Sequence, residues 1–179
     1  MRRVKATTIL LLMIGALLLS LPSITMQGQD AQAWGILSLV NDARASQGVP
    51  ALAMNSRLVA AAQLHSDDMA SGEFMSHTGS DGSRFWERMA DAGYIMTSGA
   101  ENVLYRWDLS TGGAFQQWRD SPPHNTNMMN GTYQEVGIAW ARSASGKYYY
   151  TMVLGARADF VPPTAVPPTD VPPDRKSVV

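Results

Sequence analysis

The chain has 179 residues, of which 45% are hydrophobic and 16% charged, as in an ordinary globular protein. Its formal net charge of −1 gives no electrostatic basis for binding nucleic acid. The sequence contains no cysteine, which excludes a disulfide framework, a thiolate metal site and a cysteine nucleophile. A single domain stabilised by its hydrophobic core is therefore expected.

The N-terminus has the pattern of an export signal. Three basic residues within positions 2–5 precede an apolar run over residues 6–24, and Ala31-Gln32-Ala33 offers a small-x-small cleavage site. We predict a signal peptide over residues 1–33 and a secreted, extracellular protein. Because the apolar run is close to the length that spans a bilayer, the alternative is an uncleaved anchor that keeps the protein at the cell envelope.

Two helical patterns follow this segment. Residues 34–47 carry one apolar stripe, which includes the stem of Arg44, and Gly48 ends the pattern. A second helix is expected from Asn55 or Ser56 to about Ser71, ended by Gly72. His65 falls within its apolar stripe, which predicts a core histidine with one satisfied nitrogen.

Two polar residues lie outside the helical stripes. Residues 73–82 form an aperiodic segment rich in turn residues, and His77 lies in it. A third helix is expected over residues 83–92. Glu101 then precedes a short apolar run and follows Gly99, whose lack of a side chain permits a special backbone angle. His77 and Glu101 are candidates for a functional site.

A fourth helix is expected to begin with Thr111 as its cap and to turn Ala114, Phe115 and Trp118 inward. The pair Pro122-Pro123 cannot continue a helix, because proline lacks the N–H and forces the preceding residue out of the α region. His124 is therefore predicted on a stiff turn just past a helix end.

The C-terminal part changes period. Residues 136–141 alternate between large and small side chains, residues 143–146 form a turn, and residues 147–154 are rich in β-formers, which predicts an antiparallel hairpin. Helices first and strands last indicate an α+β sandwich. Residues 161–179 repeat Val-Pro-Pro three times, which is typical of an extended tail or linker. The folded domain is thus expected over residues 34–160.

Eight short motifs follow one another along the chain. They are Leu-Val-Asn-Asp-Ala-Arg (39–44), Ala-Ala-Gln-Leu-His-Ser-Asp-Asp-Met-Ala (61–70), Phe-Met-Ser-His-Thr (74–78), Asp-Gly (81–82), Ala-Gly-Tyr (92–94), Gly-Ala-Glu-Asn-Val (99–103), Trp-Arg-Asp-Ser-Pro-Pro-His-Asn-Thr-Asn (118–127) and Tyr-Gln-Glu-Val-Gly-Ile-Ala (133–139). In this order they resemble the CAP superfamily, which comprises cysteine-rich secretory proteins, antigen 5 and pathogenesis-related type 1 proteins. The similarity is to its bacterial, SCP-like extracellular branch, which lacks cysteine and has a Ser-Pro-x-His turn.

The resemblance implies a three-layer α-β-α sandwich with a central antiparallel sheet. It also implies a cleft lined by two histidines and one or two acidic residues, which binds a divalent metal in some members. By motif, His77, Glu101 and His124 correspond to these cleft residues, and they would hold zinc or another divalent cation. The sequence departs from many eukaryotic members at Ser121, where those members carry a second glutamate.

Three chemical roles stay open for the cleft. It could bind a metal through neutral histidines, so that binding weakens below about pH 6. His77 and His124 could instead hydrogen-bond Glu101 in a structural network, or a histidine–glutamate pair could act as a general base. A Ser-His-acid triad with Ser121 or Ser76 lacks a Gly-x-Ser-x-Gly context.

Three functions correspond to these roles. The first is a secreted binding or signalling module that recognises a lipid, glycan or protein ligand at the cell envelope. The second is a metal-dependent hydrolase acting there, and the third is a non-catalytic structural or display domain with a proline-rich tail.

Overall fold

The computed structural model describes residues 24–162. Residues 1–23 of the predicted signal peptide and residues 163–179 of the predicted tail lie outside this range. The helices and strands in chain order are α1 (Ile24–Ser46), β1 (Ala53–Met54), α2 (Ser56–Gly72), α3 (Phe85–Asp91), β2 (Ser98–Arg106), α4 (Thr111–Asp120), α5 (Pro122–Met129), β3 (Glu135–Arg142) and β4 (Tyr148–Ala156).

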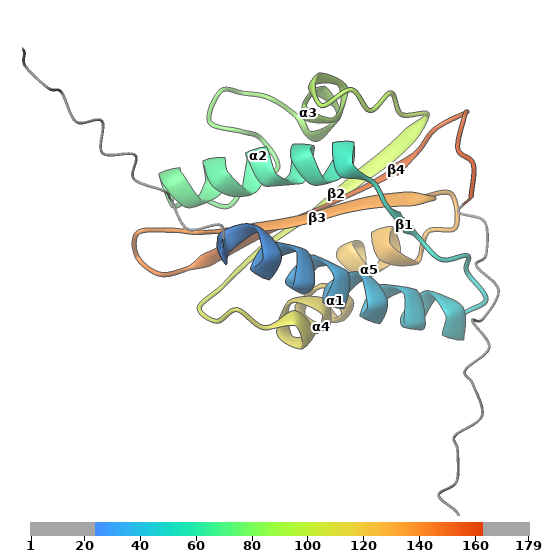
Figure 1. The fold of residues 1–179 in the computed structure, drawn as a ribbon, viewed down its shortest axis with the longest axis horizontal. Helices are drawn as coiled ribbons and strands as arrows, with labels where there is room; N and C mark the ends of the chain where they lie inside the picture. Colours follow the sequence, from blue (N-terminus) through green and yellow to red (C-terminus); the bar gives the residue numbers. More distant parts are fainter. Residues whose placement is uncertain (1–23, 163–179) are drawn as a thin grey trace, which may run out of the picture.

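One sheet forms the middle layer, with strand order β1-β3-β4-β2. Strands β3 and β4 are the predicted antiparallel hairpin, and β2 pairs antiparallel with the other side of β4. The two-residue strand β1 adds a short parallel pairing to β3. Helices α2 and α3 cover one face, and α1, α4 and α5 cover the other (Figure 1). The predicted three-layer α-β-α sandwich is confirmed.

The alternation predicted for β3 explains how both faces of the sheet are packed. Ile138 points into the core beneath α1, α4 and α5, which also contains Trp118 and Tyr150. Its neighbours Gly137 and Ala139 face α2 and are small, so that this helix approaches closely. A Cβ atom at Gly137 would lie 2.0 Å from the backbone carbonyl carbon of Leu58 in α2, so a side chain there would push the helix off the sheet.

Helix α2 has the predicted start but a different end. The Asn55 side chain accepts hydrogen bonds from the backbone N–H groups of Arg57 and Leu58, as expected for an N-cap. Gly72 remains helical, and Glu73 takes the left-handed conformation with φ of 52°. The C-cap is therefore Glu73, whereas the prediction placed the end at Gly72.

The structure corrects the predictions for three other local conformations. The N-cap of α4 is Ser110, whose side chain accepts from the Gly113 N–H, and Thr111 is the first helical residue. Gly99 does not have positive φ; instead its position is crowded, since a Cβ there would lie 2.7 Å from Met96 Sδ and 3.1 Å from the Leu154 carbonyl oxygen. The two prolines follow the end of α4 but occupy the first positions of α5, so that His124 lies in the first turn of a helix, whereas the prediction placed it on a stiff turn just past a helix end. Proline is tolerated there because the N–H that it lacks has no intrahelical partner.

Helix α1 begins at Ile24, ten residues before the predicted start, and runs through the predicted cleavage site. Gln32 and Ala33 are buried. Gln32 Nε2 donates to the hydroxyl of Tyr150 at 3.3 Å, and Gln32 Oε1 accepts from the hydroxyl of Thr111 at 2.7 Å. These two residues therefore contribute to the core although they precede residue 34. None of the helices within residues 24–162 is both long and apolar enough to cross a lipid bilayer.

A protein that begins at Trp34 is expected to be about 2 kcal/mol less stable than one that begins at Ile24, because it loses the Gln32 hydrogen bonds and the burial of Ala33. Urea denaturation of the two proteins measures the difference. A Gln32→Ala variant of the longer protein separates the contribution of the side chain from that of the helical turn. Equal midpoints for the two lengths would show that residues 24–33 add nothing to the fold.

Candidate functional site

The three predicted site residues come from three different elements. His77 lies in the loop after α2, Glu101 lies on β2, and His124 lies in the first turn of α5. Strand β2 was not predicted from the sequence. It is an edge strand, and successive side chains of a strand point to opposite faces of a sheet. Glu101 faces α2 and α3, whereas Asn102 faces α5, so that the site wraps around this edge.

Glu101 is the centre of a buried polar cluster. Its side chain is only 1% exposed, and its Oε2 accepts from Arg88 Nη2 at 2.7 Å. Its Oε1 accepts from His77 Nδ1 at 3.0 Å and lies 3.8 Å from His65 Nε2. A buried carboxylate is costly unless it is paired and hydrogen-bonded, and here Arg88 and His77 supply both conditions.

His77 is fixed on one side and open on the other. A carboxylate only accepts hydrogen bonds, so the neutral His77 ring carries its proton on Nδ1 and leaves Nε2 unprotonated. The His77 side chain is 57% exposed. An oriented imidazole with a bare nitrogen is suited to binding a metal ion or to accepting a proton.

His124 does not hydrogen-bond Glu101, which corrects the predicted network in which both histidines bond to this carboxylate. Asn102 Nδ2 donates to the backbone carbonyl of His124 at 3.0 Å, and Asn127 Nδ2 donates to Asn102 Oδ1 at 2.8 Å. Burial lowers the pKa of His124, and the charge of nearby His77 lowers it further. His124 is therefore held near His77 in its neutral form at pH 7.

Arg88 is a residue of this cluster that the sequence analysis missed. Besides Glu101, it contacts the His77 loop, where Nη2 donates to the His77 carbonyl at 3.3 Å and Nη1 donates to the Ser83 carbonyl at 2.8 Å. Its side chain is 7% exposed. In the sequence, Arg88 stands only as an arginine next to the apolar Met89 in a short helical pattern. This pattern does not indicate that Arg88 pairs with Glu101.

His65 was predicted as a core histidine with one satisfied nitrogen, and this is confirmed. It is completely buried, and its Nε2 donates to the Ser76 carbonyl at 2.7 Å, while Nδ1 has no partner. Burial lowers the pKa of His65, against the opposing effect of Glu101. The structure adds that His65 lies beside the Glu101 carboxylate, so it belongs to the wall of the site.

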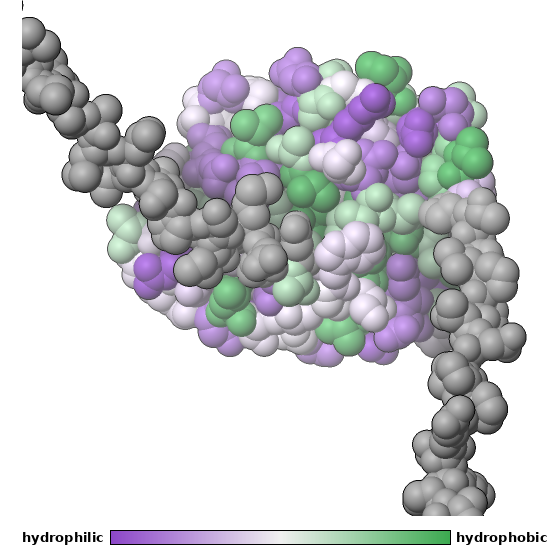
Figure 2. Space-filling model, viewed as in Figure 1, coloured by the Kyte–Doolittle hydropathy of each residue, from purple (hydrophilic) through white to green (hydrophobic). Residues whose placement is uncertain are grey.

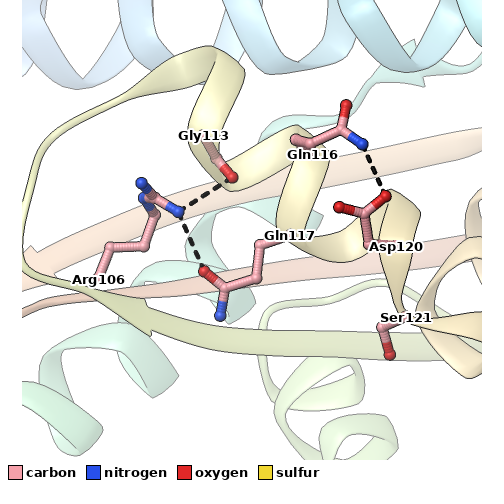
Figure 3. A pocket seen from close by; sticks show the side chains of 6 residues that line it. All are labelled: Arg106, Gly113, Gln116, Gln117, Asp120 and Ser121. Atoms are coloured by element: carbon pink, nitrogen blue, oxygen red, sulfur yellow. Dashed lines mark hydrogen bonds between the residues drawn. The ribbon is translucent and has the colours of Figure 1, made fainter.

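Ser121 and Asp120 lie in a different hollow. They line a pocket of about 480 Å³ that is formed with Arg106 and α4 (Figure 3). Asp120 Oδ1 accepts from Gln116 Nε2 at 2.7 Å, and Arg106 reaches from β2 to the Gly113 carbonyl. His77, Glu101 and His124 do not line this pocket.

The donor atoms limit what the site can hold. No group of three or more His, Asp or Glu side chains in residues 24–162 is arranged to hold a metal ion. Both oxygens of Glu101 are engaged, by His77 and by Arg88. Glu101 is therefore the hydrogen-bond acceptor behind the His77 imidazole, and it does not hydrogen-bond the His124 imidazole. In the same part of the chain, no serine hydroxyl bonds to a histidine; Ser76 Oγ accepts from the Thr78 N–H.

The sequence profile described as the cysteine-rich secretory protein family (CAP) matches residues 37–154. The chain belongs to this family. Its fold is also that of an extracellular protein from Bacillus anthracis (strain Ames) that contains an SCP domain, with a TM-score of 0.67 and 21% identity. That similarity covers 76% of this chain and 44% of the other.

Two further relatives differ in how much of their length is matched. An outer surface protein of Borrelia burgdorferi has a TM-score of 0.62 and 16% identity, over 68% of this chain and 90% of that protein. The membrane protein YlbC of Bacillus subtilis (strain 168) is 25% identical over 114 residues, which are 64% of this chain. The chain covers 32% of YlbC, about a third of that relative's length.

Proposed function

We propose that this chain is an extracellular binding module at the cell envelope and that His77 and His124 bind a divalent cation, with zinc as the best candidate. The observation that carries the proposal is the buried Glu101, which holds Nδ1 of the half-exposed His77 and leaves Nε2 open. Metal-binding histidines commonly donate their second ring N–H to a carboxylate in this way.

The other residues of the cluster support this assignment of roles. Arg88 compensates the charge of Glu101, so the carboxylate serves as a fixed acceptor instead of a ligand. Asn102 positions the backbone of His124, whose lowered pKa keeps its ring neutral and able to bind a cation. With two imidazoles as protein ligands, the remaining positions fall to water or to a group of the bound ligand.

The place of action is inferred from the relatives. One is an extracellular protein and another is an outer surface protein. A chain exported to the same place would meet lipid, glycan and protein ligands of the envelope. Hydrophilic and hydrophobic side chains are interspersed on the face shown in Figure 2, as on an ordinary domain surface. Hydrolysis would require an activated water or nucleophile, and no contact within residues 24–162 favours it over binding.

Zinc titration by calorimetry tests the proposal. The wild type is expected to bind Zn²⁺, and His77→Ala and His124→Ala are each expected to lower the affinity at least about tenfold, since each removes one of two ligands. Asp67→Asn provides a control: this exposed α2 side chain bonds to Gln63 and not to the Glu101 cluster, so the variant should leave zinc affinity unchanged. Equal affinity in wild type and His124→Ala would contradict the metal assignment.

A further inference from the structure

A second hollow borders the buried cluster, since His65 and Arg88 both line it. It has a volume of about 250 Å³ and is bounded by α2, the loop before α3, and α3 itself. It lies apart from His77 and His124, which do not line it. Its lining consists of Leu64, His65, Asp68, Ser80, Asp81, Ser83, Arg88 and Asp91.

The residues that line this hollow carry more negative than positive charge. Asp68, Asp81 and Asp91 are its acidic residues, and Arg88 is its one basic lining residue. The charge of Arg88 is already compensated by Glu101 at 2.7 Å. The field in the hollow is therefore that of three carboxylates, which attracts a cation.

Two of these carboxylates are held in place and the third is free. Asp68 accepts from the N–H and the hydroxyl of Ser80, and Asp81 accepts from the Ser83 N–H at 2.8 Å. Asp91 is exposed, and its side chain takes part in none of the hydrogen bonds or ion pairs within residues 24–162. The hollow therefore offers two carboxylates that are already fixed in place and a third that has no partner in the described part of the chain. A ligand that donates hydrogen bonds could bind to all three.

An independent observation comes from the buried wall of the hollow. His65 is completely buried, and its Nδ1 has no hydrogen-bond partner. Because its Nε2 carries the proton that is donated to the Ser76 carbonyl, Nδ1 is an acceptor in the neutral ring. A buried unpaired acceptor costs free energy unless a donor reaches it. Arg88 Nε is likewise buried and unpaired, and it is a donor that an oxygen atom or water could satisfy.

We propose that this hollow binds a primary alkylammonium group, such as the side chain of a lysine in a peptide or protein ligand. The ammonium supplies three donors in any direction, which matches the carboxylates and the two serine hydroxyls. Leu64 is 59% exposed at the rim and would contact the alkyl stem. A metal ion fits this hollow less well, since no group of three or more His, Asp or Glu side chains in residues 24–162 is arranged to hold one.

The test is a titration with pentylammonium as the probe and with 1-pentanol as its uncharged counterpart. Binding is monitored by NMR of the backbone amides in 0.15 M salt. Pentylammonium is expected to shift the amides of residues 80–83 in a saturable way, with a dissociation constant in the millimolar range, on the order of 1 mM. The alcohol is expected to leave them unchanged. Equal shifts with both compounds, or shifts confined to His77 and His124, would overturn the proposal.

Two variants with the same change of charge sharpen the result. Asp91→Asn is expected to weaken pentylammonium binding at least about threefold, since it removes the uncommitted carboxylate. Asp67→Asn alters an α2 residue that does not line the hollow and should have no effect. An unchanged constant in Asp91→Asn, or tighter saturation of the same amides by Ca²⁺, would contradict the assignment. Zinc binding at His77 is measured separately, so either result can fail without the other.

Discussion

Arg44→Met is expected to lower the free energy of unfolding by about 4 kcal/mol, because it removes the buried guanidinium that donates to four carbonyl groups. Only the stem of Arg44 was expected to be buried, yet the whole residue is. Burial lowers the pKa of its guanidinium, and no carboxylate within residues 24–162 pairs with it. Its acceptors are the carbonyl oxygens of Pro50 at 2.7 Å, Met128 at 2.6 Å, Asn130 at 3.1 Å and Tyr133 at 3.1 Å.

These contacts give Arg44 a role in placing the site. It joins the end of α1 to the end of α5, the helix that carries His124. Urea denaturation measures the loss. Arg44→Lys should be intermediate, since one ammonium cannot reach carbonyls spread around a planar fork. Arg119→Met, at an exposed position on α4, is the matched control and should cost less than about 0.5 kcal/mol. A loss as small as that of the control would show that the four bonds contribute little.

Glu101→Gln is expected to cost about 3 kcal/mol of stability, because it leaves the charge of Arg88 buried without an opposite charge. The same substitution removes the anionic acceptor of His77 Nδ1. Ring ¹⁵N shifts of His77 should then report a larger fraction of the tautomer with the proton on Nε2. If Glu101 positions His77 as we infer, zinc affinity should fall about tenfold or more in this variant.

A double-mutant cycle measures the interaction energy between Glu101 and Arg88 separately from their other contacts. Arg88→Met alone should also destabilise, and the double variant Glu101→Gln/Arg88→Met should lose less than the sum of the single losses, with a coupling of about 2 kcal/mol. Glu87→Gln, an exposed carboxylate on the same short helix, is the matched control for α3. Strict additivity of the two losses would mean that the 2.7 Å contact contributes no net stability.

Local patterns identified most of the secondary structure. The stripe of α2 and the alternation of β3 were readable because helical and extended chains repeat their burial with fixed periods. The end of α2 at Glu73 and the continuation of Pro122 into a helix were not, since cap and turn geometry depends on hydrogen bonds to neighbouring segments. The start of α1 at Ile24 was missed because residues 24–33 are mostly polar and include Ala31-Gln32-Ala33, which has the pattern of a cleavage site.

The family and the three-layer sandwich could be predicted from the sequence, and the same motifs made His77, Glu101 and His124 the candidate site residues, because ordered motifs and periodic burial are properties of the chain alone. Only the tertiary structure decided how these residues are related. Pairing of β2 with β4 sends Glu101 toward Arg88 and His65 and sends Asn102 toward α5 on the opposite face. Such contacts depend on strand order and register between distant segments, and no local period encodes them. The two histidines therefore share one edge of the sheet but not one carboxylate.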